Sequence, residues 1–153
     1  MKKILFCLVA LWLCHGTANA QSKEKGLSWA VETGIGSEWE LGGRAQYGIN
    51  KYVALEGVVK YALDFNDGAN WNEITIQPGV RAFSPEFGPG LKGFAALDLG
   101  YGIMFDNNFS TSCFALDFSV GIQYKQWYAG YGLGTLHNDG AHKDHLFRVG
   151  FYF

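Results

Sequence analysis

The chain has 153 residues, with twelve lysines and arginines against fourteen aspartates and glutamates and a formal net charge of −2. This length suits one domain rather than two, and the near-balanced charge gives no reason to expect a nucleic-acid partner. No run of 18 or more apolar residues follows the first twenty residues, so we expect no transmembrane helix.

The amino terminus has the pattern of a secretory signal peptide. Lys2 and Lys3 precede an apolar run over residues 4–14, and Ala18 and Ala20 supply small residues before a cleavage point. This pattern predicts a signal peptide over residues 1–20 and one mature domain over residues 21–153. The apolar run is too short to span a bilayer as a helix, which needs about 20 residues.

Cys113 is the only cysteine of the predicted mature chain, because Cys7 and Cys14 lie in the signal peptide. No intramolecular disulfide is therefore possible, even in an oxidising compartment. No basic residue lies close in sequence to activate the thiol, and we expect a free, buried or loop-end cysteine.

Apolar residues recur at every second position along most of the remaining chain, which is the period of a β-strand. No helical period interrupts this pattern. Eight strands are predicted, each of about the length that a tilted strand needs to cross a bilayer. In chain order they cover residues 27–36, 39–47, 53–61, 73–81, 95–103, 114–123, 127–134 and 145–153.

The connections alternate between the two ends of these strands. With both termini on the periplasmic side, residues 49–51, 83–92 and 125–126 would form periplasmic turns. The outer loops would then lie near residues 37–38, 64–71, 105–112 and 137–144. Pro78 lies inside the fourth strand, where it cannot donate a ladder hydrogen bond, and we expect a β-bulge there.

The last strand is the most informative. Phe147, Val149, Phe151 and Phe153 alternate with Arg148, Gly150 and Tyr152. Such an aromatic strand would be an aggregation hazard at a free sheet edge, but it suits a closed barrel with its phenylalanines facing lipid. The predicted fold is therefore all-β, an eight-stranded antiparallel up-and-down transmembrane β-barrel.

Charged residues of both signs gather on the face opposite the apolar one. Eight strands enclose a lumen just wide enough for side chains to fill, and paired charges could fill it at a tolerable desolvation cost. The alternative is a soluble barrel or sandwich with these charges in water, which would leave the terminal phenylalanines unexplained. The predicted interior network comprises Glu32, Glu40, Arg44, Glu56, Lys60, Glu73, Arg81, Asp98, Asp117 and Arg148.

The terminal strand over residues 145–153 and the segment over residues 50–56 resemble those of the small bacterial outer-membrane β-barrel family (porin-like, OmpX/OmpA-transmembrane type). The resemblance covers nearly the whole predicted mature chain. It implies secretion to the periplasm and residence in the outer membrane of a Gram-negative bacterium. We further expect a monomer without a cofactor. The resemblance also implies contact with outer-membrane lipid and lipopolysaccharide, and with periplasmic chaperones and the barrel-assembly machinery. In that family the final strand is the membrane-insertion signal, which here is Phe147, Val149, Phe151 and Phe153.

Three functions are compatible with such a barrel. The first, which we favour, is a non-catalytic surface protein with short loops and a filled interior. The second is a narrow pore, for which Gly130, Gly132 and Gly134 leave local room on one wall. The third is a lipid A-modifying enzyme that uses histidines of the last loop with Ser110 or Ser112. The same histidines are weak candidates for a metal site, although their spacing matches no helical pair. They are His137, His142 and His145.

Overall fold

The computed structural model describes residues 26–36, 38–64, 72–105, 110–138 and 140–153, with the side chains of 64 and 136–143 left out of the description. The predicted signal peptide therefore lies outside the described residues. No described segment forms a helix long and apolar enough to cross a membrane. The strands are β1 (Gly26–Gly36), β2 (Glu38–Asn50), β3 (Val53–Asp64), β4 (Asn72–Phe83), β5 (Leu91–Phe105), β6 (Ser110–Tyr124), β7 (Trp127–Asn138) and β8 (Gly140–Tyr152).

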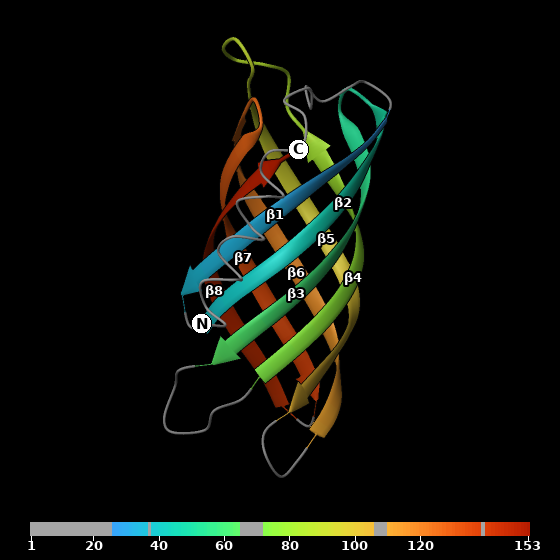
Figure 1. Cartoon of the computed structure of the whole chain (residues 1–153), viewed down its shortest axis with the longest axis vertical. Helices are drawn as coiled ribbons and strands as arrows, with labels where there is room; N and C mark the ends of the chain where they lie inside the picture. Colours follow the sequence, from blue (N-terminus) through green and yellow to red (C-terminus); the bar gives the residue numbers. More distant parts are fainter. Residues whose placement is uncertain (1–25, 37, 65–71, 106–109, 139) are drawn as a thin grey trace, which may run out of the picture.

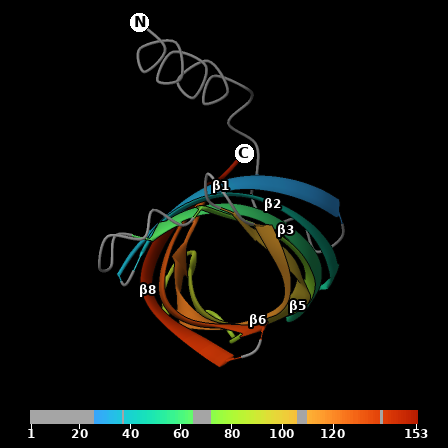
Figure 2. The same ribbon diagram turned by 90° about the horizontal axis from the view of Figure 1, so that it is seen from below.

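These strands form one closed barrel in which each pairs with its neighbours in sequence order. β8 closes the ring by pairing antiparallel with β1, from Ala30 opposite Tyr152 to Gly36 opposite Leu146. Viewed along its axis, the barrel is a complete ring of strands around a lumen (Figure 2). Closure removes every free sheet edge. The predicted eight-stranded antiparallel barrel is confirmed.

The strands are longer than the sequence pattern predicted, and the predicted last outer loop was wrong. β7 continues to Asn138 and β8 begins at Gly140, and their pairing extends to Asn138 opposite Gly140. Most of residues 137–144 are thus strand rather than loop. Backbone hydrogen bonds between strands do not depend on side-chain polarity, so a polar sequence can continue a strand once its partner is in register.

The predicted turns lie at the end of the barrel where the chain finishes. Figure 1 shows the carboxyl end of the chain and the β4–β5 connection at the same end. Asn50 shapes the β2–β3 turn, because its side-chain oxygen accepts hydrogen bonds from the backbone N–H groups of Tyr52 (2.8 Å) and Val53 (3.0 Å). Lys125, in the two-residue β6–β7 turn, has a φ of 54°. We call this the turn end and the opposite end the loop end.

The bulge predicted at Pro78 is absent. The β4–β5 register is the same on both sides of the proline, with Ile76 opposite Tyr101 and Gly79 opposite Asp98. Only Gln77 and Pro78, which lie between these two pairs, have no register partner on β5, and neither strand contains an extra residue. Gly100 makes this possible, because a Cβ there would lie 2.0 Å from the carbonyl oxygen of Ile76. The partner strand thus approaches the proline segment with a residue that has no side chain.

The two faces of the strands differ sharply in character. Large apolar side chains cover the outside, with Ile35 68 % and Phe147 58 % exposed. The inside holds arginine, lysine, aspartate, glutamate and glutamine side chains that are almost completely buried. A barrel in water would show the opposite arrangement. An apolar outer surface around a charged lumen is what a lipid bilayer requires.

Candidate functional site

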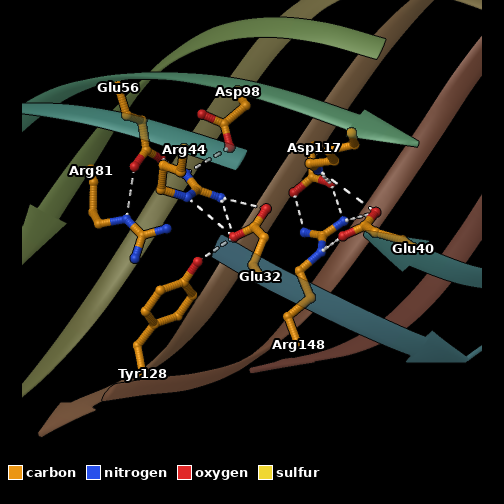
Figure 3. Close-up of polar contacts among 10 residues, drawn as sticks. Glu32, Glu40, Arg44, Glu56, Arg81, Asp98, Asp117, Tyr128 and Arg148 are labelled. Carbon is orange, nitrogen blue, oxygen red and sulfur yellow. Dashed lines mark hydrogen bonds and ion pairs between the residues drawn. The ribbon is translucent and has the colours of Figure 1, made fainter. Parts of the chain in front are cut away.

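The lumen is the candidate functional site, because all ten residues of the predicted network project into it. Nine of the ten side chains are buried, and Glu73, near the loop end of β4, is partly exposed. Figure 3 shows that most of them separate into two groups. We call these the turn-side cluster (Glu32, Arg44, Glu56, Arg81, Asp98 and Tyr128) and the loop-side cluster (Glu40, Lys60, Asp117 and Arg148).

Arg44 is the centre of the turn-side cluster (Figure 3). Its guanidinium donates hydrogen bonds to Glu32 at 3.0 and 3.2 Å and lies 2.6 Å from Glu56 and 3.6 Å from Asp98. Arg81 donates to the other carboxylate oxygen of Glu56 at 2.9 Å. Five strands thereby supply one network. Buried carboxylates of this kind are tolerated only when they are paired.

An aromatic layer closes the lumen on the turn side of this cluster. Phe94, Tyr128 and Tyr152 are buried together with Ala30. The Tyr128 hydroxyl donates a hydrogen bond to Glu32. The Arg81 guanidinium lies 4.3 Å from the ring centre of Phe94 and 5.1 Å from that of Tyr128, close enough for cation–π attraction. The layer therefore joins the ion pairs to the turn end of the barrel.

Arg148 is the centre of the loop-side cluster. It forms two-pronged hydrogen bonds with both Glu40 and Asp117, including Nη1 to Asp117 at 2.7 Å and Nη2 to Glu40 at 3.1 Å. Lys60 donates to Asp117 at 2.7 Å and lies 3.9 Å from Glu40. Two basic and two acidic groups thus compensate each other. The planar guanidinium suits such paired carboxylate contacts better than an ammonium group would.

Each of the three glycines on β7 faces a different group of side chains in the lumen. A Cβ at Gly130 would lie 2.9 Å from the ring of Phe94, and one at Gly132 would lie 2.3 Å from Nη1 of Arg148. The room predicted on this wall is therefore occupied by those two side chains. At Gly134 a Cβ would make ordinary contact, 3.5 Å from Cβ of Asp144. Only this last glycine borders open space.

A small cavity lies at that position, on the loop side of the ion pairs. Its volume is about 20 Å³, and Gly134, Glu38, Glu73, Gln77 and Asp144 are among the residues that line it. Glu38 and Asp144 are buried lumen acids that the sequence prediction missed. Both had been assigned to loops, and the alternation that continues into the ends of the strands was the signal that could have identified them.

The predicted histidine candidates do not assemble into a site among the described side chains. His145 lies on the outer face, where its Nδ1 shares a hydrogen bond with the Tyr131 hydroxyl. The side chains of His137 and His142 fall outside the description. No group of three His, Cys, Asp or Glu side chains within the described part of the chain could hold a metal ion.

His145 is also far from the serines of the predicted catalytic set. It pairs with Leu133, which pairs with Phe118 of β6. Ser112 precedes Phe118 by six residues on that strand, a separation of roughly 20 Å along it. Ser110 lies further still along the same strand. The structure therefore does not bring His145 and these serines together.

Three of the four residues of the predicted insertion signal lie on the outer face of β8, and the fourth, Phe153, directly follows the strand. Phe147 and Val149 are exposed, and Phe151 and Phe153 are partly exposed. The rings of Phe151 and Trp127 contact each other edge to face, with centres 4.8 Å apart, near the turn end. Aromatic side chains in this position are typical of the interfacial girdle of a membrane barrel.

Comparison with known proteins gives matches in structure and none in sequence. No protein-family model matches the chain, and no curated protein matches it. The N-terminal β-barrel domain of Pseudomonas aeruginosa OprF matches with a TM-score of 0.55 at 15 % identity, over 83 % of this chain and 96 % of that one. Neisserial surface protein A (NspA) matches with a TM-score of 0.59 at 12 % identity, over 82 % and 92 %. The outer membrane enzyme PagL matches with a TM-score of 0.57 at 12 % identity, over 80 % and 98 %.

These matches confirm the predicted resemblance in fold. They include an enzyme as well as proteins not described as enzymes, so shared fold does not assign an activity. This chain's own residues also favour a barrel that lies in a bilayer, because its outer face is apolar, its lumen is charged and its ring of strands is closed. The chain is a small, closed, eight-stranded antiparallel β-barrel with the fold of the outer-membrane barrels that it matches.

Proposed function

We propose that this chain is a non-catalytic outer-membrane protein whose lumen is closed to solutes and whose outer connections are presented at the cell surface. The observation that carries the proposal is the filling of the lumen at two successive levels. The aromatic layer packs against the turn-side cluster, and Arg148 spans the loop-side cluster between Glu40 and Asp117. Side chains that are ion-paired in this way resist displacement, because separating them leaves buried charges without partners.

The absence of a catalytic role is part of the same proposal. It is supported by the position of His145, which shares a hydrogen bond with the Tyr131 hydroxyl on the outer face, away from Ser112. A narrow pore is the second candidate. The cavity beside Gly134 supports it on the loop side only, because the aromatic layer closes the turn side.

The remaining expectations concern the secretion of the chain and its insertion into the membrane. Residues 1–20 would direct secretion to the periplasm, where chaperones and the barrel-assembly machinery would receive the mature chain. The outer-facing Phe147, Val149, Phe151 and Phe153 would provide the insertion signal. Lipid and lipopolysaccharide would then surround the apolar outer face, with the barrel as a monomer.

The first test is migration on an SDS gel with and without boiling, followed by conductance in a planar bilayer. We expect the unboiled mature chain to migrate differently from the boiled one and to show no steady conductance. The double variant Arg148→Ala with Asp117→Ala serves as the positive control, because it removes the groups that span the lumen at one level. A wild-type chain that conducts steadily would refute the closed lumen.

The non-catalytic assignment needs a separate measurement. Lipid A from cells that express the chain would be compared by mass spectrometry with lipid A from cells that carry an empty vector. We expect identical spectra. A mass change that disappears in His145→Ala, or in a His137→Ala and His142→Ala double variant, would show that the chain is an enzyme.

A further inference from the structure

Two acidic side chains of the turn-side cluster, Glu56 and Asp98, lie against each other in the lumen. Asp98 is completely buried, and its carboxyl group is within hydrogen-bonding reach of the Glu56 carboxyl group. Among the described side chains, Asp98 is the one carboxyl group of which both oxygens are buried without a donor. Both groups lie beside the Arg44 guanidinium (Figure 3). Two ionised carboxylates that share a buried site in this way repel each other strongly.

The register of the strands explains how Asp98 reaches Glu56. Gly79 of β4 lies between them, opposite Glu56 on β3 and opposite Asp98 on β5. A Cβ at Gly79 would lie 2.8 Å from Cγ of Asp98, so the Asp98 side chain occupies the space that the glycine leaves. The register partner of Asp98 on its other side is Asp117 of β6. An ionised Asp98 would therefore have a carboxylate on either side, and like charges opposite each other destabilise a sheet.

The basic groups of the turn-side cluster are fewer than its acids. The cluster contains the guanidinium groups of Arg44 and Arg81 and the carboxyl groups of Glu32, Glu56 and Asp98. Glu56 contacts both guanidinium groups, Arg44 at 2.6 Å and Arg81 at 2.9 Å. Asp98 lies farther from a cation, 3.6 Å from Arg44. Glu56 is thus the better stabilised anion of the two, and one proton on Asp98 would balance the charges of the cluster.

We propose that Glu56 and Asp98 share one proton, which Asp98 carries and donates in a hydrogen bond to the Glu56 carboxylate. The cluster then holds two positive and two negative charges, and Lys60 remains with Asp117, at 2.7 Å, in the loop-side cluster. At high pH the proton leaves to solvent, which makes this pair a pH-sensitive element of the lumen. The other charged and titratable side chains around the pair are Glu32 of β1, Glu40 and Arg44 of β2, Lys60 of β3, Arg81 of β4, Asp117 of β6, Tyr128 of β7, and Arg148 and Tyr152 of β8.

The shared proton has a consequence for the closed turn side of the lumen. Arg81 links Glu56 to the aromatic layer, because its guanidinium contacts the rings of Phe94 and Tyr128. Loss of the proton leaves one buried negative charge without a partner directly beside this layer. The folded barrel should therefore lose stability as the pH rises, while the ion pairs of the loop-side cluster remain formed.

The first test is the pH dependence of urea unfolding in lipid vesicles, from about pH 5 to about pH 9, for the wild-type chain and Asp98→Asn. The asparagine keeps the shape and the donor of a protonated aspartate but cannot ionise. An unfolded aspartate is ionised above about pH 4, so the wild-type chain releases one proton on unfolding that the variant does not. The unfolding constant of the wild type relative to the variant should rise about tenfold per pH unit, and level off where the folded pair loses its proton.

Asp117→Asn is the matched control, because it is the same substitution at the register partner of Asp98. Asp117 is paired with Lys60 and Arg148, so this control should unfold at lower urea than the wild-type chain at neutral pH. Asp98→Asn should match or exceed the wild-type chain under the same conditions. The same pH dependence in the wild type and Asp98→Asn, or an equal loss of stability in the two variants, would overturn the proposal.

A second measurement detects the proton in the wild-type barrel itself. With the aspartate side-chain carboxyl carbons labelled with carbon-13, one signal at neutral pH should have the chemical shift of a protonated acid, and it should move to the ionised position as the pH rises. Glu56→Gln leaves two acids and two guanidinium groups in the cluster, so Asp98 should ionise and the protonated signal should disappear. A wild-type spectrum without a protonated aspartate, or a protonated signal that persists in Asp98→Asn or in Glu56→Gln, would overturn the proposal.

Discussion

Gly132 tests most directly whether the loop-side cluster is rigid. It lies on the inner face of β7, and a Cβ at this position would lie 2.3 Å from Nη1 and 2.8 Å from Cζ of Arg148. A flexible arginine could move aside at little cost. This guanidinium is instead held from two sides by Glu40 and Asp117. We therefore expect Gly132→Ala to destabilise the barrel.

The magnitude follows from the contact. Inserting a methyl group into a packed interior costs about 1–3 kcal/mol, whereas replacing a strand glycine by alanine recovers about 0.5–1 kcal/mol. Gly134→Ala is the matched control, two residues further along the same face. Its Cβ would lie 3.5 Å from Cβ of Asp144 and 3.9 Å from the Asp117 carboxylate, which are ordinary contacts. The backbone gain is common to both variants, so their difference isolates the contact with Arg148, about 1–3 kcal/mol.

The assay is reversible urea unfolding in lipid vesicles, followed by tryptophan fluorescence and by the shift between unboiled and boiled samples on a gel. Gly132→Ala should have the lower midpoint at an unchanged slope. Gly134→Ala should match or exceed the wild-type chain. Equal midpoints for the two variants would refute the reasoning, because they would mean that Arg148 is free to move within the lumen.

Three further outcomes follow from the structure. Arg148→Met should destabilise the barrel by about 3–5 kcal/mol in the same urea assay, because it leaves the buried Glu40 and Asp117 with Lys60 alone to compensate both. Adding Asp117→Asn should restore part of the loss, and strict additivity would argue against a direct pairing. Ile76→Arg places a charge on the lipid face (Ile76 is 61 % exposed) and should cost about 2–4 kcal/mol near the bilayer midplane, whereas an unchanged midpoint would argue that this surface does not face lipid. Cys113 is 2 % exposed and should react with a maleimide only after unfolding in urea; rapid labelling of the folded barrel, measured by mass spectrometry, would contradict its burial.

The strands and their two faces could be predicted from the sequence because both are local. Alternation with a period of two needs only neighbouring residues, and the turn at Asn50 needs only its own side chain and the next backbone amides. The same locality explains the errors. The polar residues at the loop ends of β7 and β8 are typical of a loop when each strand is considered without its partner. Pro78 suggests an interruption of the strand until Gly100 on the partner strand is taken into account.

Only the tertiary structure decided which charged side chains pair in the lumen and where a cavity remains beside them. Arg44 contacts acids from β1, β3 and β5, and Arg148 joins acids from β2 and β6. Such contacts depend on the stagger of strands around the closed ring, which no single segment specifies. By itself the sequence determined that one face is apolar and the other charged. Closure of the barrel determined that the charged face lies inside, where each group must find a partner because water cannot serve all of them.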